Sequence, residues 1–185
     1  MSELFEDLEI EGLKLVIPKK HGDARGFFSE THNAETWRRA GLNYNFVQDN
    51  HSLSQDLGTL RGLHYQLEPF AQDKLVRVVR GRILDVAVDL RRSSPTFKKY
   101  VAVELSCKNW RQLFIPVGFA HGFVTLEPDT EVLYKVTNFY SPEHDFGVAW
   151  DDPEINIDWP ISYSELTLSE KDQKLPYLRD IEKLF

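Results

Sequence analysis

Short runs of β-branched and aromatic residues, separated by glycine and proline, recur along most of this chain. The clearest run spans residues 83–90, where each even-numbered position is Leu or Val and the acids Asp85 and Asp89 take odd-numbered positions. Successive side chains of a β-strand point to opposite faces, so this period of two predicts a strand with one buried apolar face. The spacing of such runs favours an all-β domain.

Four further segments have strand character, namely residues 74–78, 101–105, 113–116 and 132–136. Helical signals are short. Asn33 is placed to cap a helix over residues 34–40, which Gly41 can close, and Ser169 can cap a turn that includes Asp172. Because no repeat, low-complexity tract or linker divides the sequence, we expect a single domain over residues 1–185, a β-sandwich or jelly-roll barrel with a few short helices.

The composition excludes several classes of protein. A chain of 185 residues with 42% hydrophobic residues can bury a core, so extensive intrinsic disorder is excluded. The net charge of −7 opposes sequence-independent binding to nucleic acids and to anionic membrane surfaces. The single cysteine, Cys107, cannot form an internal disulfide, and the acidic N-terminus lacks the pattern of a secretory signal, so we expect a cytoplasmic location without a transmembrane helix.

Residues 61–66 (RGLHYQ) place a histidine in a strand-like segment beside glycine. A semi-enclosed imidazole can titrate near neutrality, which suits His64 to act as a general base. The alternative is a core histidine that is hydrogen-bonded to the backbone. Strand parity also sends Arg61 to the face opposite His64, so the two side chains can share a pocket only if Gly62 permits a β-bulge.

Residues 116–123 (PVGFAHGF) form a proline–glycine turn that leads into His121. The Pro-x-Gly-x-x-His spacing resembles one half of the metal-binding signature of cupins. The other half requires a His-x-His pair, and the corresponding residues here are His64, Tyr65 and Gln66. Since the available ligands are limited to His64, His121 and, as a third candidate, Glu68, the ligand count is marginal and a metal site is disfavoured.

Two side chains on other segments are candidates for an interior cavity. Tyr134 shares strand parity with Val132 and Val136, which predicts that its hydroxyl points inward, either as a core aromatic with one hydrogen bond or as a proton donor. Lys74 is aligned in the same way with apolar neighbours. Most other lysines are expected to be solvated, and Asp172 has an alternative role as a carboxylate at a helix start.

In combination, these segments resemble the dTDP-4-dehydrorhamnose 3,5-epimerase family. The matching blocks are GDARGFFSE (22–30), QDNHS (48–52), RGLHYQ (61–66), KLVRV (74–78), DVAVDLR (85–91), IPVGFAHGF (115–123), YK (134–135), WDDP (150–153) and LSEKD (168–172). The resemblance runs from residue 22 to about residue 176, and the order of the blocks makes it specific.

The resemblance implies a cupin-like jelly roll, a homodimer that exchanges strands, and epimerisation of a dTDP-4-keto-6-deoxy sugar without metal or organic cofactor. By the same resemblance His64 is the base and Tyr134 the acid. Asp172 pairs with the histidine, and Lys74 holds the enolate oxygen. The product would enter the synthesis of dTDP-L-rhamnose or a related deoxysugar of the cell envelope, such as that of lipopolysaccharide O-antigen.

The resemblance also assigns a set of substrate-binding positions. Two arginines would clamp the diphosphate, two aromatic rings would stack on thymine, and the remaining residues would line the nucleotide and sugar. In sequence order these positions are Arg25, Phe28, Glu30, Gln48, Asp49, Asn50, Arg61, His121, Tyr140, Asp145 and Lys171.

One loop departs from the family pattern. Asp145 stands where the family usually has glutamate, and Ala149 where a basic residue is common. These changes bear on substrate choice more than on proton transfer. The sequence leaves open inversion at C3 only or at C5 only, a metal-dependent cupin enzyme, and a sugar-nucleotide binding protein without activity.

Overall fold

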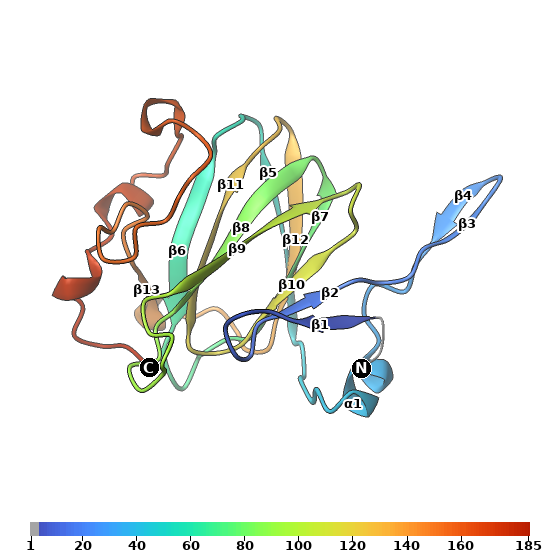
Figure 1. Ribbon diagram of the computed structural model, residues 1–185, viewed down its shortest axis with the longest axis horizontal. Coiled ribbons are helices and arrows are strands. Elements are labelled where there is room, and N and C mark those ends of the chain that lie inside the picture. The colour runs from blue at the N-terminus through green and yellow to red at the C-terminus, as the bar shows by residue number, and fades with distance from the viewer. Residues whose placement is uncertain (1–3) are drawn as a thin grey trace.

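Two antiparallel β-sheets face each other in this protein, for which a computed structural model describes residues 4–185 (Figure 1). The six-stranded sheet has the order β1 (Phe5–Asp7), β2 (Lys14–Val16), β10 (Gln112–Ile115), β7 (Lys74–Arg80), β12 (Thr130–Val136) and β5 (Gln48–Ser54). The five-stranded sheet has the order β13 (Asp145–Gly147), β6 (Leu60–Gln66), β11 (Phe119–Thr125), β8 (Arg82–Asp89) and β9 (Tyr100–Ser106). Since β5 to β8 alternate between the two sheets, the cupin-like jelly roll expected from the sequence is confirmed.

The remaining elements are short. A hairpin of β3 (His21–Asp23) and β4 (Gly26–Phe28) projects away from the two sheets (Figure 1). The α-helix is α1 (Ala34–Arg39), and the 3-10 helices are η1 (Pro142–His144), η2 (Tyr163–Glu165), η3 (Asp172–Lys174) and η4 (Leu178–Asp180). Within residues 4–185, no helix combines the length and apolar character that crossing a membrane requires.

The helix start expected from the sequence is confirmed. The Asn33 side-chain oxygen accepts hydrogen bonds from the backbone N–H groups of Glu35 and Thr36 at 2.9 and 3.1 Å. A side-chain acceptor at this position satisfies donors that the first helical turn leaves free. Trp37 is the buried residue of the helix, and it packs edge-on against Phe114 of β10.

The apolar core lies in two main layers. One cluster fills the space between the sheets and includes Val76, Val78 and Phe123. The other lies on the outer face of the five-stranded sheet, where the segment after β13 covers Val86 and Val88 (Figure 1). The C-terminal segment is thereby fixed against the sheet, and it brings residues near position 170 close to β6.

The β8 strand corrects one expectation from the sequence. The apolar face is buried as predicted, but Asp85 and Asp89 on the other face are also fully buried. Both faces of this sheet are covered, one by the facing sheet and one by the C-terminal segment. The two acids are therefore interior residues, and each must find hydrogen-bond partners.

Asp89 finds a complete set of partners. Its carboxylate accepts hydrogen bonds from the Arg91 guanidinium at 2.8 and 2.9 Å and from the hydroxyls of Ser94 and Thr96 at 2.6 and 2.7 Å. Burial alone raises the pKa of Asp89, but these hydrogen bonds outweigh burial and lower the pKa to about 2. The ionised carboxylate therefore stabilises the fold.

We expect Asp89→Asn to lower the free energy of unfolding at pH 7 by about 2 kcal/mol. Because the folded pKa lies below the unfolded value, the contribution is present above pH ~4 and is lost as the pH falls towards 2. Urea unfolding at pH 7 and at pH 3 measures the free energy of unfolding. The difference in this free energy between wild type and Asp89→Asn must be smaller at pH 3. An equal difference at both pH values would contradict the assignment.

Candidate active site

Both sheets contribute to a cavity of about 490 Å³. Strands β5, β6, β7, β11 and β12 supply side chains from the two sheets, and the C-terminal segment closes one side. The lining residues are Ser52, Thr59, Leu60, Arg61, His64, Lys74, His121, Phe123, Tyr134, Thr167, Leu168, Ser169, Lys171 and Asp172. A second cavity of about 330 Å³ shares His64, Lys74 and Tyr134 with the first.

A bulge in β6 brings Arg61 and His64 to the same cavity. Residues His121 and Phe123 of β11, two positions apart, pair with His64 and Arg61, which are three positions apart. One extra residue in β6 reverses the side-chain alternation at Gly62. The condition that strand parity set for a shared pocket is therefore met.

Gly62 occupies a position that no other residue could take without displacement. Its φ is +126°, and a Cβ atom there would lie 2.6 Å from the Cα of Gly122. We expect Gly62→Ala to destabilise the fold by about 3 kcal/mol, measured by urea unfolding. Gly41, with φ +81° and open space around it, is the matched control, for which an alanine costs about 1 kcal/mol. Equal costs at the two positions would show that the close approach to β11 is unimportant.

His64 and Asp172 form a hydrogen-bonded pair across 108 residues of sequence. His64 Nε2 donates to the Asp172 carboxylate at 2.7 Å, and the carboxylate is 5% exposed, whereas the imidazole is 30% exposed. The hydroxyl of Ser169 accepts from the backbone N–H of Asp172, which is the turn expected from the sequence. Burial raises the pKa of Asp172, but the hydrogen bond and charge of His64, together with the hydrogen bonds of Ser169 and the Gly62 backbone, outweigh burial and lower the pKa. The carboxylate is thus ionised and fixes the ring, leaving Nδ1 free to take a proton.

Tyr134 lies on the interior face of β12, opposite Asn50 of β5. Its neighbours on this face, Val132 and Val136, are buried. Burial raises the pKa of the Tyr134 hydroxyl; the charge of Arg61 lowers it and that of Asp145 raises it. The net direction is upward, so the phenol keeps its proton at neutral pH and is able to donate it.

Lys74 starts β7 on the same interior face. Its ammonium group lies 3.5 Å from the backbone oxygen of His64. Burial lowers the pKa of Lys74 to about 8, while the charges of Asp145 and Asp85 oppose that effect and Lys171 adds to it. A cation in this position can stabilise negative charge that develops on a bound ketone.

His121 of β11 faces His64 of β6 in the strand register. Its Nε2 donates to the Asp85 carboxylate at 2.7 Å, and both residues are buried. The sequence reasoning did not include Asp85 among the site residues. The sequence signal for Asp85 was an acidic residue within an apolar strand. It points to a buried carboxylate only when both faces of that strand are known to be buried.

The second cavity holds most of the remaining expected binding residues. Gln48, Asn50, Tyr140 and Asp145 line it. At the boundary of the two cavities, the Asp145 carboxylate accepts hydrogen bonds from Lys171 at 2.5 Å and from the Tyr140 hydroxyl at 3.1 Å. The residue that departs from the family pattern therefore connects the C-terminal segment to the β13 loop.

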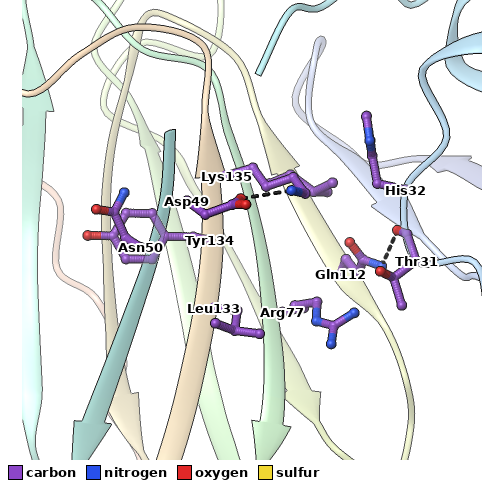
Figure 2. Close-up of a pocket in the computed structure, with 10 residues that line it drawn as sticks. Thr31, His32, Asp49, Asn50, Arg77, Gln112, Leu133, Tyr134 and Lys135 are labelled. Carbon is purple, nitrogen blue, oxygen red and sulfur yellow. Dashed lines mark hydrogen bonds and ion pairs between the residues drawn. The ribbon is translucent and has the colours of Figure 1, made fainter. Parts of the chain in front are cut away.

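Asp49, which the resemblance places at the nucleotide end of the site, does not line either of these two cavities. It alternates with Asn50 along β5, so its side chain lies on the outer face of the sheet, where it forms an ion pair with Lys135 at 2.7 Å. Figure 2 shows Asn50 and Tyr134 together on one side of the strands and Asp49 with Lys135 on the other. These outer residues border a separate hollow of about 240 Å³.

The positions expected from the N-terminal block also lie outside the cavity of this chain. Phe28 belongs to the projecting hairpin and is 71% exposed. Arg25, at the hairpin turn, forms an ion pair with Asp23 on the surface, and Glu30 is exposed. The hairpin extends away from the sheets, which is the physical reason for this placement (Figure 1).

Both histidines bond to aspartates through Nε2. In the part of the chain from residue 4 to 185, no three His, Cys, Asp or Glu side chains are arranged to hold a metal ion. The arrangement is instead that of an acid–base site: a His–Asp pair, a protonated phenol and a buried ammonium group around one cavity.

Comparison with known proteins agrees with this chemistry. Residues 7–180 match the family described as dTDP-4-dehydrorhamnose 3,5-epimerase. A protein of that name from Sinorhizobium fredii is 52% identical over 98% of this chain and 92% of its own length.

Two crystal structures are also similar. A dTDP-4-dehydrorhamnose 3,5-epimerase from Bacillus anthracis with TDP and PPi bound has a TM-score of 0.91 and 49% identity, over 94% of this chain and 98% of that one. A dTDP-6-deoxy-D-glucose-3,5-epimerase from Legionella pneumophila in complex with dTDP-4-keto-L-rhamnose has a TM-score of 0.91 and 45% identity, over 96% and 94% of the two chains.

Proposed function

This chain belongs to the dTDP-4-dehydrorhamnose 3,5-epimerase family, and we propose that it converts dTDP-4-dehydro-6-deoxy-D-glucose to dTDP-4-dehydro-L-rhamnose. The observation that carries the proposal is the convergence of His64, Tyr134, Lys74 and Asp172 on one cavity. The reaction belongs to the synthesis of dTDP-L-rhamnose. The proposed steps use only side chains of the chain itself.

The base in the proposed mechanism is His64. The C4 ketone of the substrate acidifies the hydrogens on the neighbouring carbons C3 and C5. Asp172 holds the Nε2–H of His64 and stabilises the imidazolium that forms when Nδ1 removes one of these hydrogens as a proton. The electron pair of the broken C–H bond moves into an enolate, whose oxygen lies at C4.

The acid in the proposed mechanism is Tyr134, which comes from the sheet opposite His64. Inversion requires that a proton be added to the face of the sugar ring opposite the one from which His64 removed a proton. A phenol on the opposite wall of the cavity meets this requirement. The imidazolium then releases its proton to solvent and the phenolate takes one up, which restores the base and the acid. Repeating the steps at the second carbon gives the doubly inverted product, and Lys74 stabilises the enolate oxygen in each case.

The charge on Lys74 makes the reaction sensitive to alkaline pH. Since burial lowers the pKa of Lys74 to about 8, we expect kcat/KM to decline as the pH rises through 8, when the ammonium group is lost. In Lys74→Arg the cation persists at that pH, so the decline near 8 must disappear even if the overall rate is lower. An unchanged decline in Lys74→Arg assigns the titration to another group.

Substrate binding is proposed to extend over both cavities. His121 contacts the sugar beside the base, and Arg61 binds the diphosphate. The pyrophosphate-linked nucleoside lies along the second cavity and contacts the polar residues of β5 and of the β13 loop. These residues are Gln48, Asn50, Tyr140, Asp145 and Lys171.

We infer a homodimer in which each hairpin reaches the cavity of the partner. Within the described part of the chain, Arg25 pairs only with Asp23 of its own hairpin, and the Phe28 ring is 71% exposed; exposed apolar groups of this size mark interaction sites. In this arrangement Arg25, Phe28 and Glu30 contact the nucleotide bound to the other chain.

A subunit-mixing experiment tests the shared site. Arg25→Ala and His64→Ala are each expected to be impaired when alone. If the hairpin serves the partner's cavity, unfolding and refolding the two together creates hybrid dimers with one intact site, so activity rises above the sum of the separate variants. Light scattering that shows a stable monomer, or mixing without gain, would overturn the shared site.

We also place the chain, as a single epimerase domain over residues 1–185, in the cytoplasm. Its one cysteine, Cys107, has no partner for an internal disulfide, as is usual in a reducing compartment.

The proposed reaction is tested by incubating the protein with dTDP-4-keto-6-deoxyglucose in D₂O. NMR and mass spectrometry detect the deuterium. We expect deuterium at both C3 and C5, with inversion at each carbon. Inversion at one carbon alone would identify a mono-epimerase and point to the position of the sugar relative to Asp145. Absence of exchange at both carbons would refute the proposal.

A further inference from the structure

A second histidine–aspartate pair lies beside the proposed catalytic one. Asp85, in the middle of β8, is fully buried, and its Oδ1 accepts the hydrogen bond from His121 Nε2 at 2.7 Å. Its second oxygen, Oδ2, has no hydrogen-bond partner among the described residues. Asp85 does not line the cavity itself: it reaches the cavity through its hydrogen bond to His121, and its charge also acts on Lys74.

The two pairs share one geometry. His64 and His121 are cross-strand partners in β6 and β11, and each ring directs Nε2 to an aspartate at 2.7 Å. An ionised carboxylate accepts hydrogen bonds only, so it fixes the proton of a neutral imidazole on Nε2 and leaves Nδ1 without one. In each ring Nδ1 makes no hydrogen bond to another residue between 4 and 185. The two pairs therefore predict the same tautomer for both imidazoles of the cavity.

Stability does not account for Asp85. Burying a carboxylate is costly unless all its lone pairs find donors. Asp89, on the same strand and equally buried, accepts hydrogen bonds from Arg91, Ser94 and Thr96. Asp85 accepts one from His121 and leaves its other oxygen free. A residue that costs stability in this way is expected where it serves a site.

We propose that Asp85 is a positioning residue, which holds His121 in one tautomer and orientation so that this ring can hydrogen-bond the substrate beside His64. The role rests on the proposed function, since it acts on the same cavity. Asp85 itself does not touch the substrate. Its effect passes through His121, in the way that a buried aspartate orients a catalytic imidazole.

The test replaces Asp85 by asparagine, which keeps the size but can donate its amide N–H to Nε2 and so favours the other tautomer. We expect kcat/KM to fall about 100-fold while the melting temperature stays within about 3 °C of wild type. Asp89→Asn is the matched control, with the opposite pattern: a lower melting temperature and unchanged kcat/KM. A loss of activity in Asp85→Asn that merely follows a loss of stability would overturn the proposal.

A double-variant cycle tests whether the effect passes through His121. At a pH about two units below the Lys74 pKa of about 8, Lys74 stays charged with or without Asp85. If the effect passes through His121, Asp85→Asn then adds nothing in a His121→Ala background, so the double variant equals His121→Ala. Additive losses in kcat/KM would assign Asp85 a separate effect and overturn the positioning role.

Imidazole ¹⁵N NMR of the wild-type protein gives a readout that needs no turnover. The expected spectrum has His121 protonated at Nε2 and bare at Nδ1, with the proton moved to Nδ1 in Asp85→Asn. Wild-type protein with the opposite tautomer overturns the inference, even if Asp85→Asn fails to fold. A protein with the expected spectrum but no deuterium exchange would instead refute the proposed function and leave the Asp85–His121 pairing intact.

Discussion

Replacing His64 with alanine is expected to lower kcat/KM by at least about 1,000-fold. The imidazole is the one group of the cavity that combines a carboxylate-oriented ring with a free nitrogen and substantial exposure, since its side chain is 30% exposed. Without it, neither C3 nor C5 loses its proton, so deuterium incorporation must disappear at both carbons. Because the loss of the ring also leaves the buried Asp172 carboxylate without its side-chain donor, the melting temperature is measured beside turnover to separate loss of the base from loss of the fold.

The matched control is His51→Ala. His51 lies on β5, is 54% exposed at its side chain and pairs with Glu131 on the surface, outside the lining of the catalytic cavity. We expect this variant to retain wild-type rates of epimerisation and exchange. A His64→Ala variant with near-normal turnover would show that another residue is the base.

The strand positions could be predicted from the sequence because period-two alternation is a local signal. The segments expected at 74–78, 101–105 and 132–136 lie within β7, β9 and β12. The short strands β1 to β4 lack that signal: each contains only three residues, too few for alternation to be read.

Contacts between distant segments could be predicted only through the family resemblance. The hydrogen bond between His64 and Asp172 joins residues 108 positions apart, and no property of either local sequence specifies it. The same limit explains Asp85, whose pairing with His121 depends on which strand lies beside β11.

Strand parity predicts the face of a side chain correctly where the hydrogen-bond pairing of the strands is regular. It fails where a β-bulge interrupts that pairing. Parity correctly predicts that Tyr134 shares the inner face of β12 with Val132 and Val136. At Gly62 parity alone puts Arg61 and His64 on opposite faces, and the bulge reverses that result. A glycine inside a strand is the local sign of such a bulge, but only the register establishes it.

Replacing Tyr134 with phenylalanine is expected to separate proton exchange from inversion. The base and its carboxylate partner are unchanged, so His64 still removes a proton, exchanges it with solvent and returns deuterium to the same face of the carbon. Return to the opposite face requires the phenol, whose pKa is raised chiefly by burial and which is therefore protonated at neutral pH. Epimerised product should fall about 100-fold, while deuterium continues to enter substrate of unchanged configuration.

The measurement is mass spectrometry of recovered substrate alongside NMR of product, with Tyr163→Phe as the control. Tyr163 is 61% exposed and packs on Trp150 away from the cavity, so its hydroxyl should be dispensable for both readouts. Phenylalanine at position 134 fills the same space beside Val132 and Val136, which keeps the fold intact. If exchange and inversion in Tyr134→Phe decline together, the hydroxyl is needed before the proton is returned, and its role shifts from acid to stabilisation of the enolate.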